Sequence, residues 1–357
     1  MVRRNETNRL EYFLMKTLYY IGFFLLLSTA AHAGNGSRAG EAGATQLLIN
    51  PYARSSALAN ANTSSVEGLE SQFINIAGLT KTKGTELIFC RTSWLTGTDI
   101  NINTFGFSQK LGEKNFLSFG IMSFSMGNIQ ITTVDLPEGG IGTYSPQFVN
   151  VGGSYARQFT NSISGGVTLR VISEAVANIQ GIGVAIDAGI QYLTGKKKHI
   201  GFGIALKNVG PKMSYGGDGL SVKAMFSADR QLVSLESRSQ AFELPLLMNI
   251  GAHYRFDIAT HHQLLAQATF VSNAFMKDQY CLGLEYRFKK YLMLRTGFAY
   301  EEGIFNINTR STALTGPTAG FSIEIPYKEK TVFAFDYAYR DTSPFSGTHS
   351  FGARISF

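Results

Sequence analysis

Apolar and polar residues alternate with a period of two along most of the chain. The segment 181–192 shows this alternation most clearly. Its even positions are apolar, namely Ile182, Val184, Ile186, Ala188, Ile190 and Tyr192. Its odd positions are small or polar, including Gly183, Ala185, Asp187, Gly189 and Gln191. Successive side chains of a β-strand point to opposite faces, so this pattern predicts a strand with one apolar face.

Segments of this kind follow one another to the C-terminus. Fourteen strands are expected, at 84–94, 100–111, 115–125, 147–159, 162–175, 181–194, 199–210, 243–256, 261–271, 279–289, 291–301, 317–326, 331–340 and 348–357. All are longer than the five or six residues usual in globular sheets. An even number of long antiparallel strands is typical of a bacterial outer-membrane β-barrel.

The two faces of the expected strands differ in a way that predicts their surroundings. One face carries aromatic and branched aliphatic residues, whereas the other carries glycine with scattered charged and amide side chains. In a membrane barrel the apolar face meets lipid and the polar face lines the lumen. We therefore expect the apolar face to point outward, against outer-membrane lipid.

The connections between the expected strands sort into two classes. Long connections, at 126–146, 211–242 and 302–316, all fall in one alternate set. The other set is uniformly short, at 112–114, 160–161, 195–198, 257–260, Lys290 and 327–330. Bacterial barrels have short periplasmic turns and longer outer loops. The long set is therefore predicted to lie outside the cell, with both chain ends in the periplasm.

The N-terminal region differs from the rest. Residues 1–33 combine basic residues, an apolar run and Ala31-His32-Ala33, which predicts a cleaved signal peptide and export to the outer membrane. Met15 is an alternative start, and a transmembrane anchor is the alternative interpretation of the apolar run. Residues 34–83 are irregular, small and polar, and the alternating region occupies 84–357.

Composition and charge exclude some classes of protein. The 357 residues include 38 Gly and 27 Phe, with only 16% charged residues, and the mean hydropathy of +0.01 excludes a bundle of membrane helices. The net charge of +7 arises partly from the predicted signal peptide. The one tight basic cluster, Lys196–His199, falls in a short predicted periplasmic turn. It favours contact with lipid headgroups, and no nucleic-acid partner is predicted.

The predicted lumen face carries charges of both signs. Its charged and titratable residues are Arg170, Lys207, His253, Arg287, Arg295, Arg354, Asp187, Glu285 and Asp336. They could form a selective pore or polar ligand site, or an internal network of ion pairs. We favour the network, because burying charges of one sign alone would be costly. Such a lumen also argues against a wide conduit for fatty acids.

Catalytic chemistry has little support in the sequence. His253 is the only histidine expected mid-strand on the lumen face, and local spacing places no serine or acid beside it. A Ser–His site assembled across strands remains an alternative. Cys90 and Cys281 are expected to be free, and no Cys/His spacing suits a metal. We predict no catalytic residue, cofactor or metal site, and thus no enzyme.

Several stretches resemble the motifs of one family. Residues 43–58 are similar to an opening in which an apolar segment leads to ARxxALG. Residues 73–79 (FINIAGL) resemble a WNPAGL box, 206–215 (LKNVGPKMSY) an xxNxGPxxxY motif, and 315–321 a GPTAGF-like strand. Together they resemble the PorV/PorQ family, itself similar to FadL-type barrels. Asn60 and Ile76 stand where that family usually has Gly and Pro, so local turn geometry is expected to differ.

The resemblance adds a fold detail and a function to the prediction. It implies an all-β, 14-stranded antiparallel transmembrane β-barrel with an N-terminal plug segment, in which 34–83 form the periplasmic or plug part. It also implies a component of type IX protein secretion in Bacteroidetes-type bacteria. The implied partners are the C-terminal signal domain of secreted cargo and a large translocon barrel or surface attachment protein. The sequence leaves open which of these roles applies.

The implied partner surface lies on the outer loops. The candidate partner-binding residues are Tyr215, Met225, Phe226, Leu232, Val233, Leu136 and Tyr144, because apolar side chains on long loops favour protein binding. The alternatives are a loop folded over the barrel mouth for 211–242 and a plain turn-rich loop for 135–144. The alternative function is a FadL-like outer-membrane channel for small hydrophobic compounds.

Overall fold

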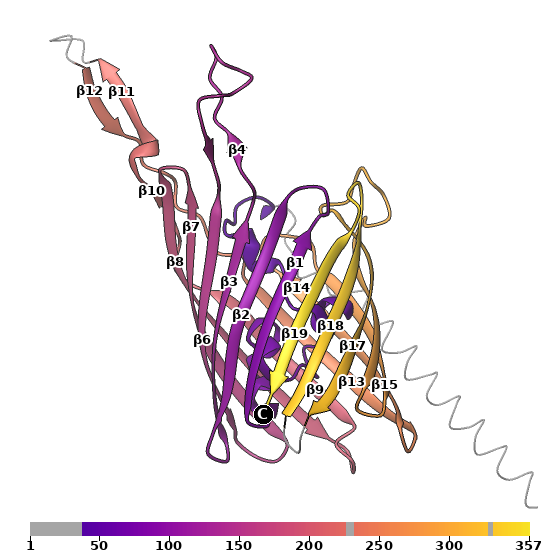
Figure 1. The fold of residues 1–357 in the computed structure, drawn as a ribbon. Coiled ribbons are helices and arrows are strands. Elements are labelled where there is room, and N and C mark those ends of the chain that lie inside the picture. Colours follow the sequence, from indigo (N-terminus) through magenta and orange to yellow (C-terminus); the bar gives the residue numbers. More distant parts are fainter. Residues whose placement is uncertain (1–37, 226–231, 328–330) are drawn as a thin grey trace, which may run out of the picture.

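A computed structural model describes residues 38–225, 232–327 and 331–357 (Figure 1). Fourteen long antiparallel strands form one sheet. They are β1 (Thr85–Trp94), β2 (Ile100–Leu111), β3 (Asn115–Ser125), β6 (Gln147–Gln158), β7 (Ile163–Val176), β8 (Ile179–Thr194), β9 (Ile200–Val209), β13 (Leu247–Ala259), β14 (His262–Asn273), β15 (Gln279–Phe288), β16 (Leu292–Glu301), β17 (Leu314–Tyr327), β18 (Thr331–Thr342) and β19 (Thr348–Ser356). The expected strand number is confirmed, and the boundaries differ from expectation by four residues at most.

The sheet closes on itself to form a barrel. The first strand, β1, pairs with the last, β19, and β9 pairs with both β8 and β13. Every long strand therefore has a partner on each side, and the sheet has no free edge that would expose backbone groups to lipid. The long connections gather at one end of the barrel and the short ones at the other, where the C-terminus lies (Figure 1).

The alternation along the strands separates lipid from lumen as expected. In β8, Ile182 is 66% exposed on the outer surface, whereas Asp187 on the opposite face is 4% exposed. The same division holds in β2, where Phe105 and Phe107 are exposed and Thr104 is buried. The inverted arrangement, apolar outside and polar inside, is confirmed. Among the described residues, no helix is long and apolar enough to cross a membrane.

The segment before β1 lies inside the barrel as a plug of short helices (Figure 1). Its elements are η2 (Thr45–Leu48), α2 (Ala53–Ala57), η3 (Gly68–Glu70), α3 (Ser71–Ile74) and η4 (Ile76–Lys81). Leu69 and Phe73 of the plug pack with Ile102 and Phe124 of the wall in the largest apolar cluster. A buried apolar core thus joins plug and barrel. The predicted signal peptide, 1–33, lies outside the described residues.

Two outer connections contain strands that the sequence analysis did not predict. In the first, β4 (Ile129–Gln130) pairs with β5 (Thr143–Tyr144), so the plain loop expected at 135–144 belongs to a hairpin. In the second, β10 (Tyr215–Gly216) and η5 (Asp218–Leu220) lead to the paired strands β11 (Ser221–Met225) and β12 (Leu232–Glu236). Both rise above the barrel mouth (Figure 1). Strands of two to five residues carry too few alternations to be recognised by period.

Candidate functional site

The plug touches the barrel wall where the wall carries glycine. Gly106, Gly120 and Gly152 are consecutive partners across β2, β3 and β6, and they face Leu69 and Gln72 of the plug. On the opposite wall, a Cβ at Gly297 would lie 2.5 Å from the carbonyl carbon of Leu58. No side chain fits in that space. These lumen glycines therefore allow the plug backbone to approach the wall closely.

Asn75 anchors the plug to two strands at once. Its Nδ2 donates to the carbonyl oxygens of Ile190 in β8 at 3.1 Å and Ile204 in β9 at 3.4 Å. Within the plug, Nδ2 also donates to the Thr63 carbonyl oxygen at 2.9 Å, and Oδ1 accepts from the Ala77 backbone at 3.2 Å. Asn75 is fully buried, so its amide depends on these partners in place of water. It belongs to the FINIAGL stretch that carried the family resemblance.

The plug makes a tight turn beside β15 and β16. Ala59 and Asn60 both have left-handed backbones, with φ of 51° and 62°. The Asn60 side chain accepts a hydrogen bond from Asn50 Nδ2 at 2.7 Å. Asparagine tolerates this backbone better than most residues, which explains how Asn60 can occupy the turn.

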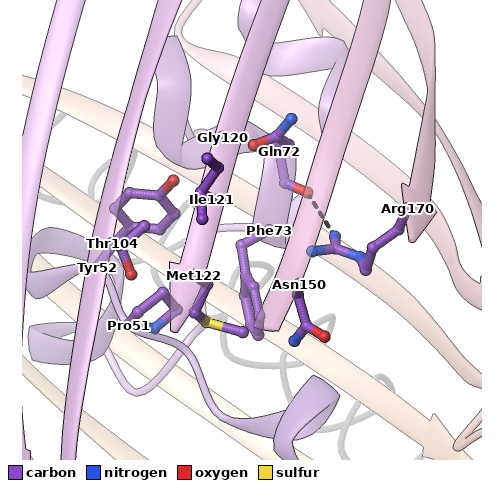
Figure 2. A pocket seen from close by; sticks show the side chains of 10 residues that line it. All are labelled: Pro51, Tyr52, Gln72, Phe73, Thr104, Gly120, Ile121, Met122, Asn150 and Arg170. Atoms are coloured by element: carbon purple, nitrogen blue, oxygen red, sulfur yellow. Dashed lines mark hydrogen bonds between the residues drawn. The ribbon is translucent and has the colours of Figure 1, made fainter. Parts of the chain in front are cut away.

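Paired charges fill part of the lumen around the plug. Glu285 binds Arg295 Nε at 2.5 Å and also binds Arg287. Arg170 Nη2 donates to Asp187 at 2.8 Å. It also donates to the Gln72 carbonyl of the plug at 3.2 Å (Figure 2). The expected network of ion pairs on the lumen face is therefore present.

Asp187 and Lys207 mark a bulge in the wall. Lys207 and Asn208 of β9 together oppose Asp187 of β8, and the Asn208 backbone donates to Asp187 Oδ1 at 2.7 Å. The buried Lys207 ammonium lies 4.0 Å from the ring centroid of Phe73. A cation over an aromatic face is stabilised by the ring quadrupole. The bulge thus directs one lumen cation onto the plug.

His253 meets a serine that sequence spacing could not reveal. Its Nδ1 lies 3.0 Å from the hydroxyl of Ser64, which the plug supplies. Ser64 is fully buried, and neither residue lines any of the three cavities described below. This pair therefore serves the contact between plug and wall, and a substrate could reach the hydroxyl only if the plug moved. No group of three potential metal ligands occurs among residues the structure describes.

Three cavities lie between plug and wall. The central cavity, of about 270 Å³ with its mouth, is lined by Tyr52, Phe73, Met122, Asn150 and Arg170 among others (Figure 2). The inner cavity, about 360 Å³ with the space open to solvent, is lined by Arg54, Leu58, Asn62, Glu67, Glu70, Glu285, Arg287 and Arg295 among others. The outer cavity, about 490 Å³ with the space open to solvent, is lined by Ala59, Asn60, Glu301, Ile304, Leu314, Arg340 and Asp341 among others. The plug turn 58–62 lies between the outer and inner cavities.

Two charged residues of the outer cavity, Glu301 and Arg340, were missed by the sequence analysis. Arg340 continues the lumen face of Ala334, Asp336 and Ala338, so its parity already placed it inside. Glu301 likewise follows Arg295 at even spacing on β16. Extending each alternating face to the outer end of its strand would have found both residues.

The candidate partner-binding residues lie in several places. Met225 and Leu136 are exposed on separate outer hairpins, whereas Val233 and Tyr144 are half-buried. Tyr215 donates to Glu174, and burial together with this hydrogen bond raises the pKa of Tyr215. Leu232 pairs with Met225 in the β11–β12 ribbon. Phe226 lies outside the described residues. The structure therefore brings together only Met225, Leu232 and Val233, on one ribbon.

These features define the class of the protein. It is a β-barrel of the outer-membrane type, closed by fourteen strands and filled by an N-terminal plug. A closed sheet with an apolar outer belt satisfies its backbone internally and meets lipid with its side chains.

The same fold occurs in solved hydrocarbon channels and transporters. The monoaromatic hydrocarbon channel CymD is 14% identical with a TM-score of 0.52, covering 87% of this chain and 97% of its own. The toluene transporter TodX of Pseudomonas putida is 13% identical with a TM-score of 0.54, covering 86% of this chain and 98% of its own. At these identities the likeness establishes a shared fold. No protein-family profile and no curated protein sequence matches the chain.

Proposed function

We propose that this protein is an outer-membrane channel for small, largely hydrophobic compounds, as the FadL-like alternative predicts. The observation that carries the proposal is the plugged fourteen-stranded barrel, shared along most of the chain with channels for monoaromatic hydrocarbons. The outer cavity supports it, because Ala299, Ile304, Leu314 and Pro317 contribute apolar walls at the barrel mouth. Apolar walls with a few polar groups are typical of small-molecule sites.

The filled lumen is compatible with this role only if the plug moves. The outer and inner cavities are separated by the turn 58–62, which packs against Gly283 and Gly297. A compound that enters the outer cavity can therefore continue only after this turn shifts. The lumen charges that argued against a wide conduit suit a closed channel that admits one small molecule at a time.

Uptake by living cells tests the proposal. Radiolabelled toluene uptake is measured in cells lacking the protein, in cells with the wild type restored, and in cells with Leu136→Ser and Met225→Ser. We expect deletion to lower the initial rate, and both the wild type and the double variant to restore it, since Leu136 and Met225 lie on the hairpins. An unchanged rate after deletion would contradict the proposal.

The second candidate is the role in type IX secretion, with binding of cargo or attachment partners through the outer hairpins. It is supported by exposed apolar residues there, including Val134, which is 99% exposed, as well as Leu136 and Met225. We expect copurification of a larger barrel or a surface attachment protein, lost in the same double variant and kept in the control Ser234→Ala. Normal secretion without the protein would exclude this role.

A further inference from the structure

The outer cavity lies under an irregular part of the barrel wall. In β17, Leu314 pairs with Thr342, but pairing with β18 resumes only at Thr318. Gly316 has φ of 111°, and Pro317, which has no backbone N–H, is the last residue paired with β16. The ladder is thus interrupted over residues 315–317, at the level of the cavity. Leu314, Gly316 and Pro317 of this interrupted stretch line the outer cavity.

The cavity contains a buried cation that has no carboxylate partner. Arg340 is 5% exposed, its Nη2 donates to the Asn50 carbonyl at 3.1 Å, and its guanidinium lies 4.9 Å from the Trp94 ring centroid. Its Nε has no hydrogen-bond partner. None of the ion pairs found within 38–225, 232–327 and 331–357 involves Arg340. A buried guanidinium without an anion is costly, so this site favours an added carboxylate.

The same cavity contains carboxylates that have only neutral partners. Glu301 is 1% exposed and accepts from Gln279 Nε2 at 3.0 Å and from the Ser311 hydroxyl. Asp341 accepts from the hydroxyls of Thr315 and Tyr339. In the described part of the chain, no ion pair includes either carboxylate. Glu301 and Asp341 therefore present negative charge that an ammonium group would compensate.

We propose that the outer cavity binds a small zwitterion with an apolar body, such as an amino acid with an apolar side chain. The ligand carboxylate binds Arg340, its ammonium group binds Glu301 and Asp341, and its body lies against Ile304, Leu314 and Pro317. This inference rests on the proposed channel function and adds a charged, amphipathic compound to the hydrocarbons that the channel is proposed to admit.

The inner cavity supports this substrate class. Beyond the turn 58–62 it offers guanidinium groups of Arg54, Arg287 and Arg295 together with carboxylates of Glu67, Glu70 and Glu285. Most of these groups already pair with one another, as Arg54 does with Glu70 and Glu285 does with Arg287 and Arg295, so they line a polar passage and are not a second binding site. Polar walls are less costly for a zwitterion than for a hydrocarbon. Both cavities along the β15–β16 wall are therefore compatible with one ligand chemistry.

Isothermal titration of the full-length barrel in detergent tests the inference. The probes are phenylalanine, 3-phenylpropanoate, 2-phenylethylamine and ethylbenzene, which share an aromatic body and differ in their charges. We expect phenylalanine to bind at least about ten-fold more tightly than each of the others, since it alone satisfies both kinds of site. Trp94 is the only tryptophan, so its fluorescence reports the same binding beside Arg340.

Two variants and one control test which charged residue of the outer cavity binds each end of the ligand. Arg340→Gln is expected to weaken phenylalanine binding at least about ten-fold while leaving the affinity for 2-phenylethylamine unchanged. Glu301→Gln is expected to weaken phenylalanine binding similarly and to leave that for 3-phenylpropanoate unchanged. Glu302→Gln is the matched control, because Glu302 is exposed. Circular dichroism checks that each barrel is folded.

Two outcomes would overturn the inference. If ethylbenzene binds as tightly as phenylalanine, the proposed zwitterionic ligand is wrong, although the proposed hydrocarbon channel is not contradicted. If none of the four probes binds, the outer cavity is not a site for this ligand class. Failure of the channel itself appears separately, as toluene and phenylalanine uptake that deletion does not change.

Discussion

At the scale of single residues, Glu285 is the charge on which the inner part of the lumen depends. It lies between Arg287 and Arg295 and is buried. Replacing it by Gln leaves two guanidinium groups without their anion. Removing one partner of a buried ion pair costs about 3–5 kcal/mol.

We therefore expect Glu285→Gln to lower the free energy of unfolding by about 3–5 kcal/mol, measured by urea denaturation of the refolded barrel in lipid vesicles. The exposed Glu302→Gln should change it by less than about 0.5 kcal/mol. Equal effects of the two variants would show that the lumen ion pairs contribute nothing to stability.

The second prediction for a single residue concerns Asn75. Asn75→Ala removes the hydrogen bonds to the buried Thr63 and Ile190 carbonyls, so we expect a loss of about 1–3 kcal/mol. The plug should also become sensitive to added protease. Asn178→Ala is the control, because Asn178 lies in an exposed turn. A plug as resistant as the wild type would exclude Asn75 as an anchor.

At the scale of elements, the glycines of β15 and β16 determine where the turn 58–62 can lie. Gly297→Ala would place a methyl group 2.5 Å from the Leu58 carbonyl carbon, so the turn must shift. We expect a loss of about 1–3 kcal/mol and raised ion conductance in planar bilayers. Gly153→Ala, at a position with open space, is the control and should leave both unchanged. Unchanged conductance in Gly297→Ala would contradict close packing of the turn 58–62 against β16.

The elements also show where sequence reasoning succeeds. Period-two alternation fixes both the existence and the facing of a long strand, because each residue contributes independently to the pattern. The β11–β12 ribbon was missed because its strands have only five residues each, too few for the alternation to be recognised. The candidate residues Met225 and Val233 were chosen as loop positions and lie instead on paired strands.

At the scale of the whole molecule, the barrel could be predicted from the sequence and the contacts of the plug could not. Closure follows from strand count and connection parity, which are local properties. The pairing of Ser64 with His253, or of Gln72 with Arg170, joins residues far apart in the chain. Such contacts depend on how deep the plug lies. The outer cavity could not be predicted for the same reason, since Ala59 and Arg340 line it from parts of the chain that come together only in the folded barrel.

The central claim is that compounds cross this barrel when the plug moves. A disulfide between plug and wall tests it, using Ala53→Cys and Gly352→Cys in a chain with Cys90→Ala and Cys281→Ala. A Cβ at Gly352 lies 3.8 Å from that of Ala53, which suits a disulfide, and Ala53 begins the helix before the turn 58–62.

The decisive measurement is toluene uptake by cells that carry this double-cysteine protein, compared before and after reduction. We predict slow uptake in the oxidised form, near that of cells without the protein, and recovery to the wild-type rate when the disulfide is reduced. Uptake by the oxidised protein at the wild-type rate would contradict a moving plug as the route through the barrel.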